Sequence, residues 1–458
     1  MKEIVNYTKL EPNERIEITN DIINMLYDTN IQNSDKLSPK ERSEYYGIEV
    51  KPLNKLFSGY YIINSFIHEN NKESNPNNKS FPILQKMDMI KWLCFYEETN
   101  YKEAQDLYNH LFRASKRYEL KINEPEWVEM PNRGNANDWI DKADFYFSNG
   151  KNEYDFVIFL IGRNTSIYKV LKQHSLYKNK YVSQAVKISS IKRKGLLSIC
   201  SKILLQINEK LGGISFKAHF DRFITERKIM AIGVDTSHIK GNRTGLAMVA
   251  TINDTFSDFF NKEDIIEEKN KRQLAFPISS FLDEAIEVYQ KENNNERVRG
   301  VIIYRQGVSF EQKDYLKSEI LQIDNICKIK CVNYYYILVN KKVNFKFFEK
   351  SNKGFSNPES GLLVMDGITN KNYFEFYIQP QEITQGSAIP ICYHVAYGNF
   401  DFPEIIPKLA YDLCNIYCNY QGKIRIPNVL KMAEKLSKMA VKYKPDNNSE
   451  YRLGKTYV

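Results

Sequence analysis

The chain has 458 residues, and its hydrophobic content of 42% is enough for two or three domains with real cores. Lys and Arg total 65 against 56 Asp and Glu, and the resulting formal charge of +9 permits a polyanionic partner. The seven Cys match no zinc-binding pattern, and neither a membrane-spanning run nor a secretory leader is recognisable. We therefore expect a protein of the cytoplasm or the nucleus, without membrane contact and without a disulfide framework.

Residues 1–83 open with a helical pattern at 12–26, where Pro12 suits a first helical turn and apolar residues follow near helical spacing. A very hydrophilic run at 69–80 predicts a loop. The segment is too small and too open for an independent enzyme. We interpret it as a linker that lies along a larger body.

Residues 84–213 alternate between strand-like and helix-like patterns. The predicted strands span 89–96 and 154–161, and the predicted helices span 101–118, 168–176 and 194–210. Such alternation is typical of an α/β domain with a parallel sheet. Leu211-Gly212-Gly213 is a strong signal for the end of the last helix.

Residues 214–458 contain two short apolar runs that predict buried strands ending in polar residues. The first run, 229–234, ends at Asp235, and the second, 301–304, is followed by Arg305 and Gln306. Further predicted elements are a hairpin partner at 244–252, a helix at 278–292, strands at 328–339, 361–365 and 373–378, and helices at 402–417 and 427–442. This order fits a mixed sheet of the ribonuclease-H type, which holds metal ions at its strand ends.

Two helical segments carry a possible phosphate-binding set. Tyr168 and Lys172 are four residues apart and share one helix face, as do Gln206 and Lys210, while Gln184 follows on a predicted polar loop. A ring hydroxyl, ammonium groups and amides that converge would hold a terminal phosphate through charge-assisted hydrogen bonds. The alternative is that both lysines are solvated charges on exposed helix faces.

Several segments resemble the Argonaute/Piwi family. The set Tyr168-x3-Lys172, Gln184 and 202–213 looks like the MID domain of that family, and Arg305-Gln-Gly-Val-Ser309 looks like a motif of its PIWI domain. Further PIWI-like segments lie at 357–361, 385–390, 393–395, 413–417, 422–427 and 433–436. Several of these are most similar to the Piwi branch.

The resemblance implies an α/β fold with three parts. A second-linker-like segment at 1–83 precedes a MID domain at 84–213, which has a parallel α/β sheet and binds the guide 5′ end. A ribonuclease-H-like PIWI domain follows at 214–458. The N and PAZ domains of full-length relatives are expected to be missing.

The resemblance also assigns roles in a guide-binding pocket. Tyr168 is expected at the first base, and Lys172, Gln184, Gln206 and Lys210 at phosphates. The carboxylate of Val458 is expected in the same pocket. A Mg²⁺ ion bound by Gln184 and Val458 would offset the charge that is lost because Gln206 stands where many relatives have Lys.

In slicing members of the family, four residues hold two Mg²⁺ ions. By resemblance, Asp235 matches the first of the four. Leu274 stands near the expected loop Glu, Gln306 replaces the second Asp, and Glu434 occupies the last position. A neutral amide removes a full negative charge from the centre of the site, so we expect a catalytically inactive domain. The alternative is a weak metal-dependent slicer that uses Asp235 and Glu434.

The implied partners are a 5′-phosphorylated guide RNA, a complementary target RNA, and a protein that supplies an effector or the missing lobe. Arg425 and Lys423 are expected at the guide backbone, where basic residues bind phosphates without reading sequence. His238 and His394 are interpreted as structural, since neither has a partner acid and nucleophile at a recognisable spacing.

The alternative to a guide-binding protein that recruits a partner is a short prokaryotic-type Argonaute that signals to an associated effector.

Overall fold

The computed structural model describes residues 10–18, 60–61, 83–132, 134–148, 154–162, 165–178, 181–216, 218, 220–239, 243–267, 275–308, 313–344, 346–369, 373–400, 403, 405–420, 422–444 and 452–454. The chain divides into two compact units, one made of Met1–Ile63 and Val339–His394, the other of Asn64–Leu338 and Val395–Val458. Leu274, Val458, the predicted loop at 69–80 and residues 19–26 of the predicted first helix lie outside the described residues.

The second unit begins with a parallel sheet of four strands, in the order β3-β2-β4-β5. These strands are β2 (Trp92–Glu97), β3 (Glu126–Met130), β4 (Phe156–Ile161) and β5 (Ser183–Lys187), and every neighbouring pair is parallel. All six residues of β4 are buried, because its unbroken apolar run faces helices on both sides. The predicted parallel α/β sheet is confirmed.

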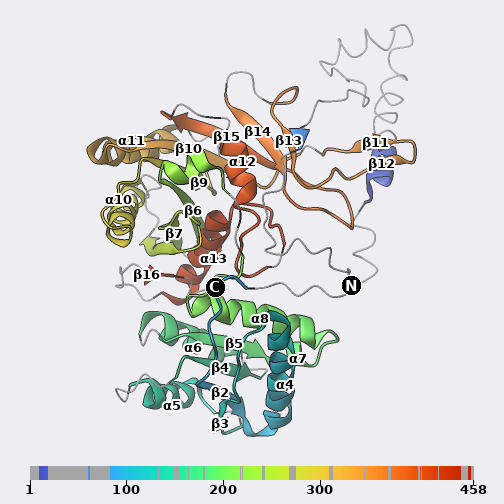
Figure 1. Cartoon of the computed structure of the whole chain (residues 1–458), viewed down its shortest axis with the longest axis vertical. Coiled ribbons are helices and arrows are strands. Elements are labelled where there is room, and N and C mark those ends of the chain that lie inside the picture. Colours follow the sequence, from blue (N-terminus) through green and yellow to red (C-terminus); the bar gives the residue numbers. More distant parts are fainter. Residues whose placement is uncertain are drawn as a thin grey trace. The chain divides into compact units, whose positions relative to one another are not determined.

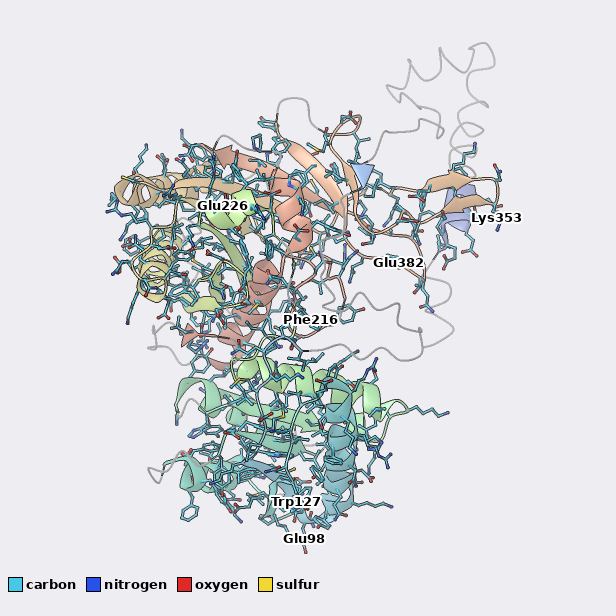
Figure 2. All side chains as sticks on the ribbon, in the orientation of Figure 1. Glu98, Trp127, Phe216, Glu226, Lys353 and Glu382 are labelled. Carbon is cyan, nitrogen blue, oxygen red and sulfur yellow. The ribbon has the colours of Figure 1, made fainter. Side chains whose placement is uncertain are left out.

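Helices cover both faces of this sheet (Figure 1). α4 (Tyr101–Tyr118) and α8 (Leu196–Lys210) pack on one face, and α5 (Ala136–Ser148) and α6 (Thr165–Tyr177) pack on the other. The short helices η1 (Glu98–Asn100) and α7 (Ile188–Ile191) complete this part. At the β3 edge, Trp127 packs edge-to-face against Tyr96, Tyr101 and Tyr108. Figure 2 labels Trp127 among the side chains of this part.

The same unit continues into a mixed sheet with the strand order β10-β9-β6-β7-β8-β16. The strands are β6 (Ile229–Ile239), β7 (Arg243–Thr251), β8 (Phe259–Glu267), β9 (Gly300–Arg305), β10 (Asn333–Asn340) and β16 (Arg452–Leu453). β6, β7 and β8 form an antiparallel meander, while β6, β9 and β10 run parallel. This arrangement is the ribonuclease-H-like sheet that the strand pattern predicted.

Helices also cover both faces of the mixed sheet. α10 (Ala275–Glu292) and α11 (Lys313–Lys330) pack on one face, and α13 (Asn428–Tyr443) lies along β6 and β7 on the other. A Cβ atom added to Gly233 of β6 would overlap the backbone of Val429, so the glycine permits the close approach of α13. α9 (Arg222–Glu226) and α12 (Ile405–Asp412) complete the described helices here.

The first unit contains short antiparallel strands. β1 (Tyr60–Tyr61), β13 (Leu362–Val364), β14 (Glu375–Gln379) and the start of β15 (Ile391–Gly398) pair in that order, and β11 (Glu349–Ser351) forms a hairpin with β12 (Gly354–Ser356). Residues 12–18 are helical, as the sequence predicts. None of the described helices is long and apolar enough to cross a membrane.

One predicted strand begins too early. The pattern at 328–339 predicts a strand throughout, but α11 extends to Lys330 and β10 begins only at Asn333. Cys331 ends the helix with a φ of 56°, and Val332 N donates to the carbonyl oxygen of Cys327. The turn between them is too tight to be seen in the hydropathy pattern, because apolar and basic residues alternate through it.

Candidate functional site

The predicted phosphate-binding residues come from three elements of the second unit. α6 carries Tyr168 and Lys172, and α8 carries Gln206 and Lys210. Gln184 lies on β5 and not on a loop, so the loop prediction is wrong. The polar composition of β5 concealed a strand that pairs with the buried β4.

Lys210 and Gln184 are in direct contact. Lys210 Nζ donates to Gln184 Oε1 at 2.6 Å and to the carbonyl oxygen of Ser183 at 2.9 Å. An ammonium group has three donors, so one remains for a ligand. Gln206 is half-buried one turn earlier on α8.

Neither lysine is a solvated surface charge, because Lys172 is only 8% exposed and Lys210 only 5%. Burial, followed by repulsion from Lys435 and Arg452, lowers the pKa of Lys172 to about 7. Burial, Lys172 and Lys435 hold the pKa of Lys210 well below its usual value. Within the described part of the chain, no hydrogen bond or ion pair reaches Lys172 Nζ. Buried amino groups for which the described residues supply no counter-ion are candidates for contact with an anion.

Two further cations lie at this place, and sequence reasoning missed both. Lys435 comes from α13, and Arg452 comes from β16. Arg452 pairs with Glu263 and stacks 5.2 Å from the ring centroid of Tyr177. No spacing rule links these residues to α6 or α8, since they meet only when the chain folds.

The ring of Tyr168 is held by an aromatic neighbour. Tyr443, the last residue of α13, lies edge-on to it, with 6.1 Å between the ring centroids and an interplanar angle of 80°. Burial, with a smaller contribution from Tyr443, raises the pKa of the Tyr168 hydroxyl. The hydroxyl therefore stays protonated at neutral pH, and it is a hydrogen-bond donor.

Asp235 and Gln306 are neighbours at the point where β6 and β9 separate. The parallel pairing of these strands ends at Val234 and Arg305, and Gln306 N donates to the carbonyl oxygen of Val234 at 3.0 Å. The sequence predicted that the strand ends at Asp235. This prediction is wrong, because β7 pairs with β6 as far as Ile239. Asp235 is 2% exposed, and its Oδ2 accepts from Ser437 Oγ of α13 at 2.6 Å.

A buried ion pair holds the backbone at Gln306. Arg305 donates through Nε and Nη2 to Glu319 of α11, at 3.1 and 3.0 Å, and both side chains are fully buried. Arg305 Nη1 also donates to the carbonyl oxygen of Gln306 at 2.5 Å. Gln306 Oε1 is buried and accepts no hydrogen bond from the described residues.

Glu434 faces lysines of its own helix. Its carboxylate is 3.2 Å from Lys431 Nζ and 2.5 Å from Lys438 Nζ. Among the described residues, no three His, Cys, Asp or Glu side chains are grouped so that they would hold a metal ion. Asp235 and Glu434 therefore do not form such a cluster with another described acid or histidine.

The other singled-out residues have local partners. Lys423 Nζ donates to the hydroxyl of Tyr411 at 2.7 Å, and Arg425 is half-buried two residues further on. His238 Nδ1 lies 2.8 Å from Thr244 Oγ1, and His394 Nδ1 lies 3.5 Å from Glu375 Oε2. His238 lies in β6 and His394 lies in β15, so both contacts are made within the sheets.

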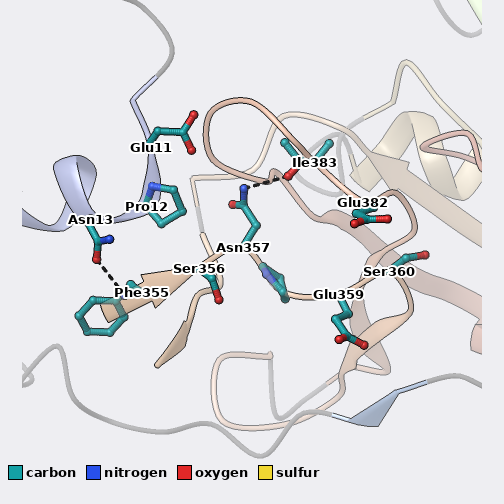
Figure 3. Close-up of a pocket in the computed structure, with 11 residues that line it drawn as sticks. Glu11, Pro12, Asn13, Phe355, Ser356, Asn357, Glu359, Ser360, Glu382 and Ile383 are labelled. Atoms are coloured by element: carbon teal, nitrogen blue, oxygen red, sulfur yellow. Dashed lines mark hydrogen bonds between the residues drawn. The ribbon is translucent and has the colours of Figure 1, made fainter. Parts of the chain in front are cut away.

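A cavity of about 620 Å³ in the first unit has acidic lining residues, in contrast to the cluster of basic residues in the second unit (Figure 3). Glu11, Glu359 and Glu382 line it, and none of its lining residues is Lys or Arg. Asn357 closes one wall by donating to the carbonyl oxygen of Ile383 at 3.3 Å. Its carboxylates would repel a phosphate, so the cation cluster of the second unit is the better anion site.

A parallel α/β sheet followed by a ribonuclease-H-like sheet, with buried cations on the first, is the arrangement of an Argonaute-type MID–PIWI protein. The family model described as the Piwi domain matches residues 155–444, which is more than half of the chain. The chain belongs to the Piwi family, and the family resemblance seen in its sequence is confirmed.

Curated relatives support the same assignment. Piwi-like protein Ago3 of Bombyx mori is 25% identical over 460 residues, which cover 95% of this chain and 47% of that protein. The chain spans about half the length of the curated relatives it matches.

Solved structures share the fold. Drosophila Piwi has a TM-score of 0.79 and 21% identity, with 100% of this chain and 63% of that chain covered. Kluyveromyces polysporus Argonaute, solved with a guide RNA, has a TM-score of 0.73 and 16% identity, with 96% of this chain and 57% of that chain covered.

Proposed function

We propose that this protein anchors the 5′-phosphate of a small guide RNA and pairs the guide with a target RNA. The observation that carries the proposal is the buried amino group of Lys172, for which the described residues supply no counter-ion and which lies beside a second buried lysine, Lys210. A terminal phosphate would neutralise both groups, while a 5′-hydroxyl would not. The similar Kluyveromyces polysporus Argonaute holds a guide RNA.

In this proposal each pocket residue has a distinct role. Tyr168 packs against the first base, and Lys172 and Lys210 bind phosphate oxygens as point charges. Gln184 positions Lys210 through their 2.6 Å hydrogen bond, and Gln206 adds an amide donor. We place the boundary between the guide-end domain and the ribonuclease-H-like domain after residue 213.

The proposed Mg²⁺ ion fits only a guide-bound pocket. Gln184 Oε1 already accepts from Lys210, and the surrounding cations repel a metal ion. The guide phosphate and the carboxylate of Val458 would supply the negative oxygens that Mg²⁺ prefers, with Gln184 as a neutral ligand. Removing divalent ions with EDTA should then weaken binding of phosphorylated guide and leave unphosphorylated guide unaffected. Equal binding with and without EDTA would exclude the ion.

Lysine substitutions test the anchoring proposal. We expect K172A or K210A to weaken binding of phosphorylated guide by about tenfold to a hundredfold, because a charged hydrogen bond contributes about 1.5–3 kcal/mol. Filter binding or fluorescence anisotropy would measure this for guides with a 5′-phosphate and a 5′-hydroxyl. K169A and K202A are matched controls, since both lysines are exposed on the same two helices. The anchoring proposal is wrong if the unaltered protein binds both guides equally.

We further propose that the protein does not cleave its target. Gln306 brings a neutral amide beside Asp235, and Glu434 is neutralised by Lys431 and Lys438. Two Mg²⁺ ions would then lack the negative charge that they require. Guide-loaded protein mixed with complementary target and Mg²⁺ or Mn²⁺ should leave the target intact on a denaturing gel. A product cut opposite guide nucleotides ten and eleven would instead support the weak slicer that uses Asp235 and Glu434.

Without cleavage, the output of target pairing would be recruitment of a protein partner. Arg425 and Lys423 would bind phosphates of the guide backbone. Double substitution of these two residues by Ala should weaken both guides alike and lower the salt dependence of binding. If the double substitution weakens binding of the phosphorylated guide only, these residues contact the 5′ end and not the backbone.

A further inference from the structure

A group of aromatic side chains lies at one edge of the four-stranded parallel sheet. The strand order β3-β2-β4-β5 puts β3 at this edge, whereas Gln184 lies on β5 at the opposite edge. Tyr101, Tyr108 and Phe112 form a stripe on α4, because they are spaced seven and four residues apart. Trp127 of β3 lies edge-to-face against Tyr101 and Tyr108, with 5.9 and 6.2 Å between the ring centroids. These four residues are called the aromatic surface below.

Solvent reaches the aromatic surface. Tyr101 is 42% exposed and Phe112 is 40% exposed, while Tyr108 and Trp127 are half-buried. Neighbouring exposed apolar side chains mark an interaction surface more strongly than scattered ones do. Lys116 Nζ lies 4.7 Å from the centroid of the Phe112 ring, so a cation of the chain itself already contacts one of these rings.

Two carboxylates border the aromatic surface. Glu124 Oε1 accepts from Trp127 Nε1 at 3.0 Å, and Glu129 Oε2 accepts from the hydroxyl of Tyr96 at 3.4 Å. Both glutamates are exposed, and neither forms an ion pair with another described residue. Lys142 Nζ donates to the backbone carbonyl oxygen of Glu129 at 3.3 Å and not to its carboxylate. Because their printed partners are neutral donors, both carboxylates keep a full negative charge for a ligand.

Aromatic rings next to carboxylates fit a cationic ligand. A guanidinium group stacks on an aromatic ring and donates two parallel hydrogen bonds to a carboxylate, whereas an ammonium group is a more strongly hydrated point charge. Bases of a nucleic acid would also stack on the rings, but Glu124 and Glu129 would repel its phosphates. The formal charge of the whole chain is +9, so a basic peptide would bind only through a local site.

We propose that the aromatic surface, together with Glu124 and Glu129, binds an arginine side chain of a partner protein. The ring of Tyr96, whose hydroxyl donates to Glu129, lies 5.4 Å from the ring of Tyr101. The guanidinium group lies against the exposed Tyr101 ring and pairs with the adjacent carboxylate. This inference does not depend on guide anchoring, because none of these residues belongs to the phosphate-binding set.

The test uses the whole protein and a fluorescein-labelled peptide of alternating Arg and Gly. Two matched peptides carry Lys, or the neutral isostere citrulline, in place of Arg, and fluorescence anisotropy measures the affinity of each. We expect the arginine peptide to bind more tightly than the lysine peptide, and the citrulline peptide to bind at least about tenfold more weakly. Equal binding of the arginine and citrulline peptides would show that no cation is recognised, and the proposal would then be wrong.

Substitutions locate the binding site. We expect Y101A and E129Q each to weaken binding of the arginine peptide by about threefold to tenfold, whereas Y101F keeps the ring and the affinity. E126Q is the matched control, because Glu126 is an exposed residue of the same strand and its side chain alternates to the other face of the sheet. Thermal melts of the variants identify a loss that comes from misfolding. Equal losses in E126Q and E129Q would contradict the proposed site.

Two further results would also overturn the proposal. If E359Q weakens binding of the arginine peptide and E129Q does not, the peptide occupies the acidic cavity of the first unit. If Y101A weakens binding of an unphosphorylated single-stranded RNA and leaves the arginine peptide unaffected, the rings stack on bases, and the ligand is a nucleic acid.

Discussion

At the scale of single residues, the pocket lysines show what burial does to a charge that has no partner. Lys172 has a pKa of about 7, against an ordinary value of 10.5, because burial and then Lys435 and Arg452 disfavour its charged form. The folded protein without guide therefore binds fewer protons than the unfolded chain between about pH 7 and pH 10.5. Through this group, its stability rises with pH across that window.

Guide binding should have the opposite pH dependence. A bound phosphate stabilises the charged lysine and raises its pKa, so affinity is greatest at low pH and falls as the pH rises above about 7. The preference for a 5′-phosphate over a 5′-hydroxyl, measured by anisotropy between pH 6.5 and pH 9, should shrink steadily. K172M should flatten that decline. A preference that is constant over this range would show that Lys172 keeps its charge without help from the guide.

At the scale of elements, the contact between α13 and β6 places Ser437 over Asp235. Gly233 permits this contact, because any Cβ atom there would overlap the backbone of α13. We expect G233A to destabilise the protein by about 1–3 kcal/mol through overpacking, as measured by urea denaturation. G300A on the adjacent β9 is the control, since its Cβ would lie 3.3 Å from the Phe400 ring and not against a backbone. Equal losses for the two variants would contradict a special role for Gly233.

At the scale of the molecule, a phosphorylated guide would contact α6 and α8 of the second unit. A ligand that binds only the folded state stabilises it by about 2.7 kcal/mol at a hundred times its dissociation constant. We therefore expect phosphorylated guide to raise the melting temperature more than an unphosphorylated guide at the same concentration, measured by differential scanning fluorimetry. The difference should shrink in K172A and persist unchanged in K169A. If both guides raise the melting temperature equally, contacts to the guide backbone alone stabilise the protein.

Much of the fold followed from local patterns in the sequence. Apolar periodicity placed α4 at Tyr101–Tyr118, and the apolar run of β4 marked a strand buried on both faces. Ordered motifs from residue 168 onwards carried the family resemblance, which the match at 155–444 confirmed. Patterns of this kind depend on a few neighbouring residues, so they are readable without the fold.

The missed elements had weak local signals. β5 is polar in part, so the sequence around Gln184 predicted a loop. The pairing with β4 makes this segment a strand. Asp235 looked like the end of β6 because the apolar run stops there, but β7 continues the pairing to Ile239. In both cases hydrogen bonds to a neighbouring strand outweighed the local composition.

The sequence by itself determined part of the order of helices and strands, the family, and the neutral amide at Gln306, but it gave no signal for β3, α5 or α11. The tertiary structure alone decided that Lys172 and Lys210 are buried, and that Lys435 and Arg452 join them. Periodicity and motifs are properties of short stretches of chain. Desolvation and repulsion between charges depend on distances between residues that are far apart in sequence, and only folding sets those distances.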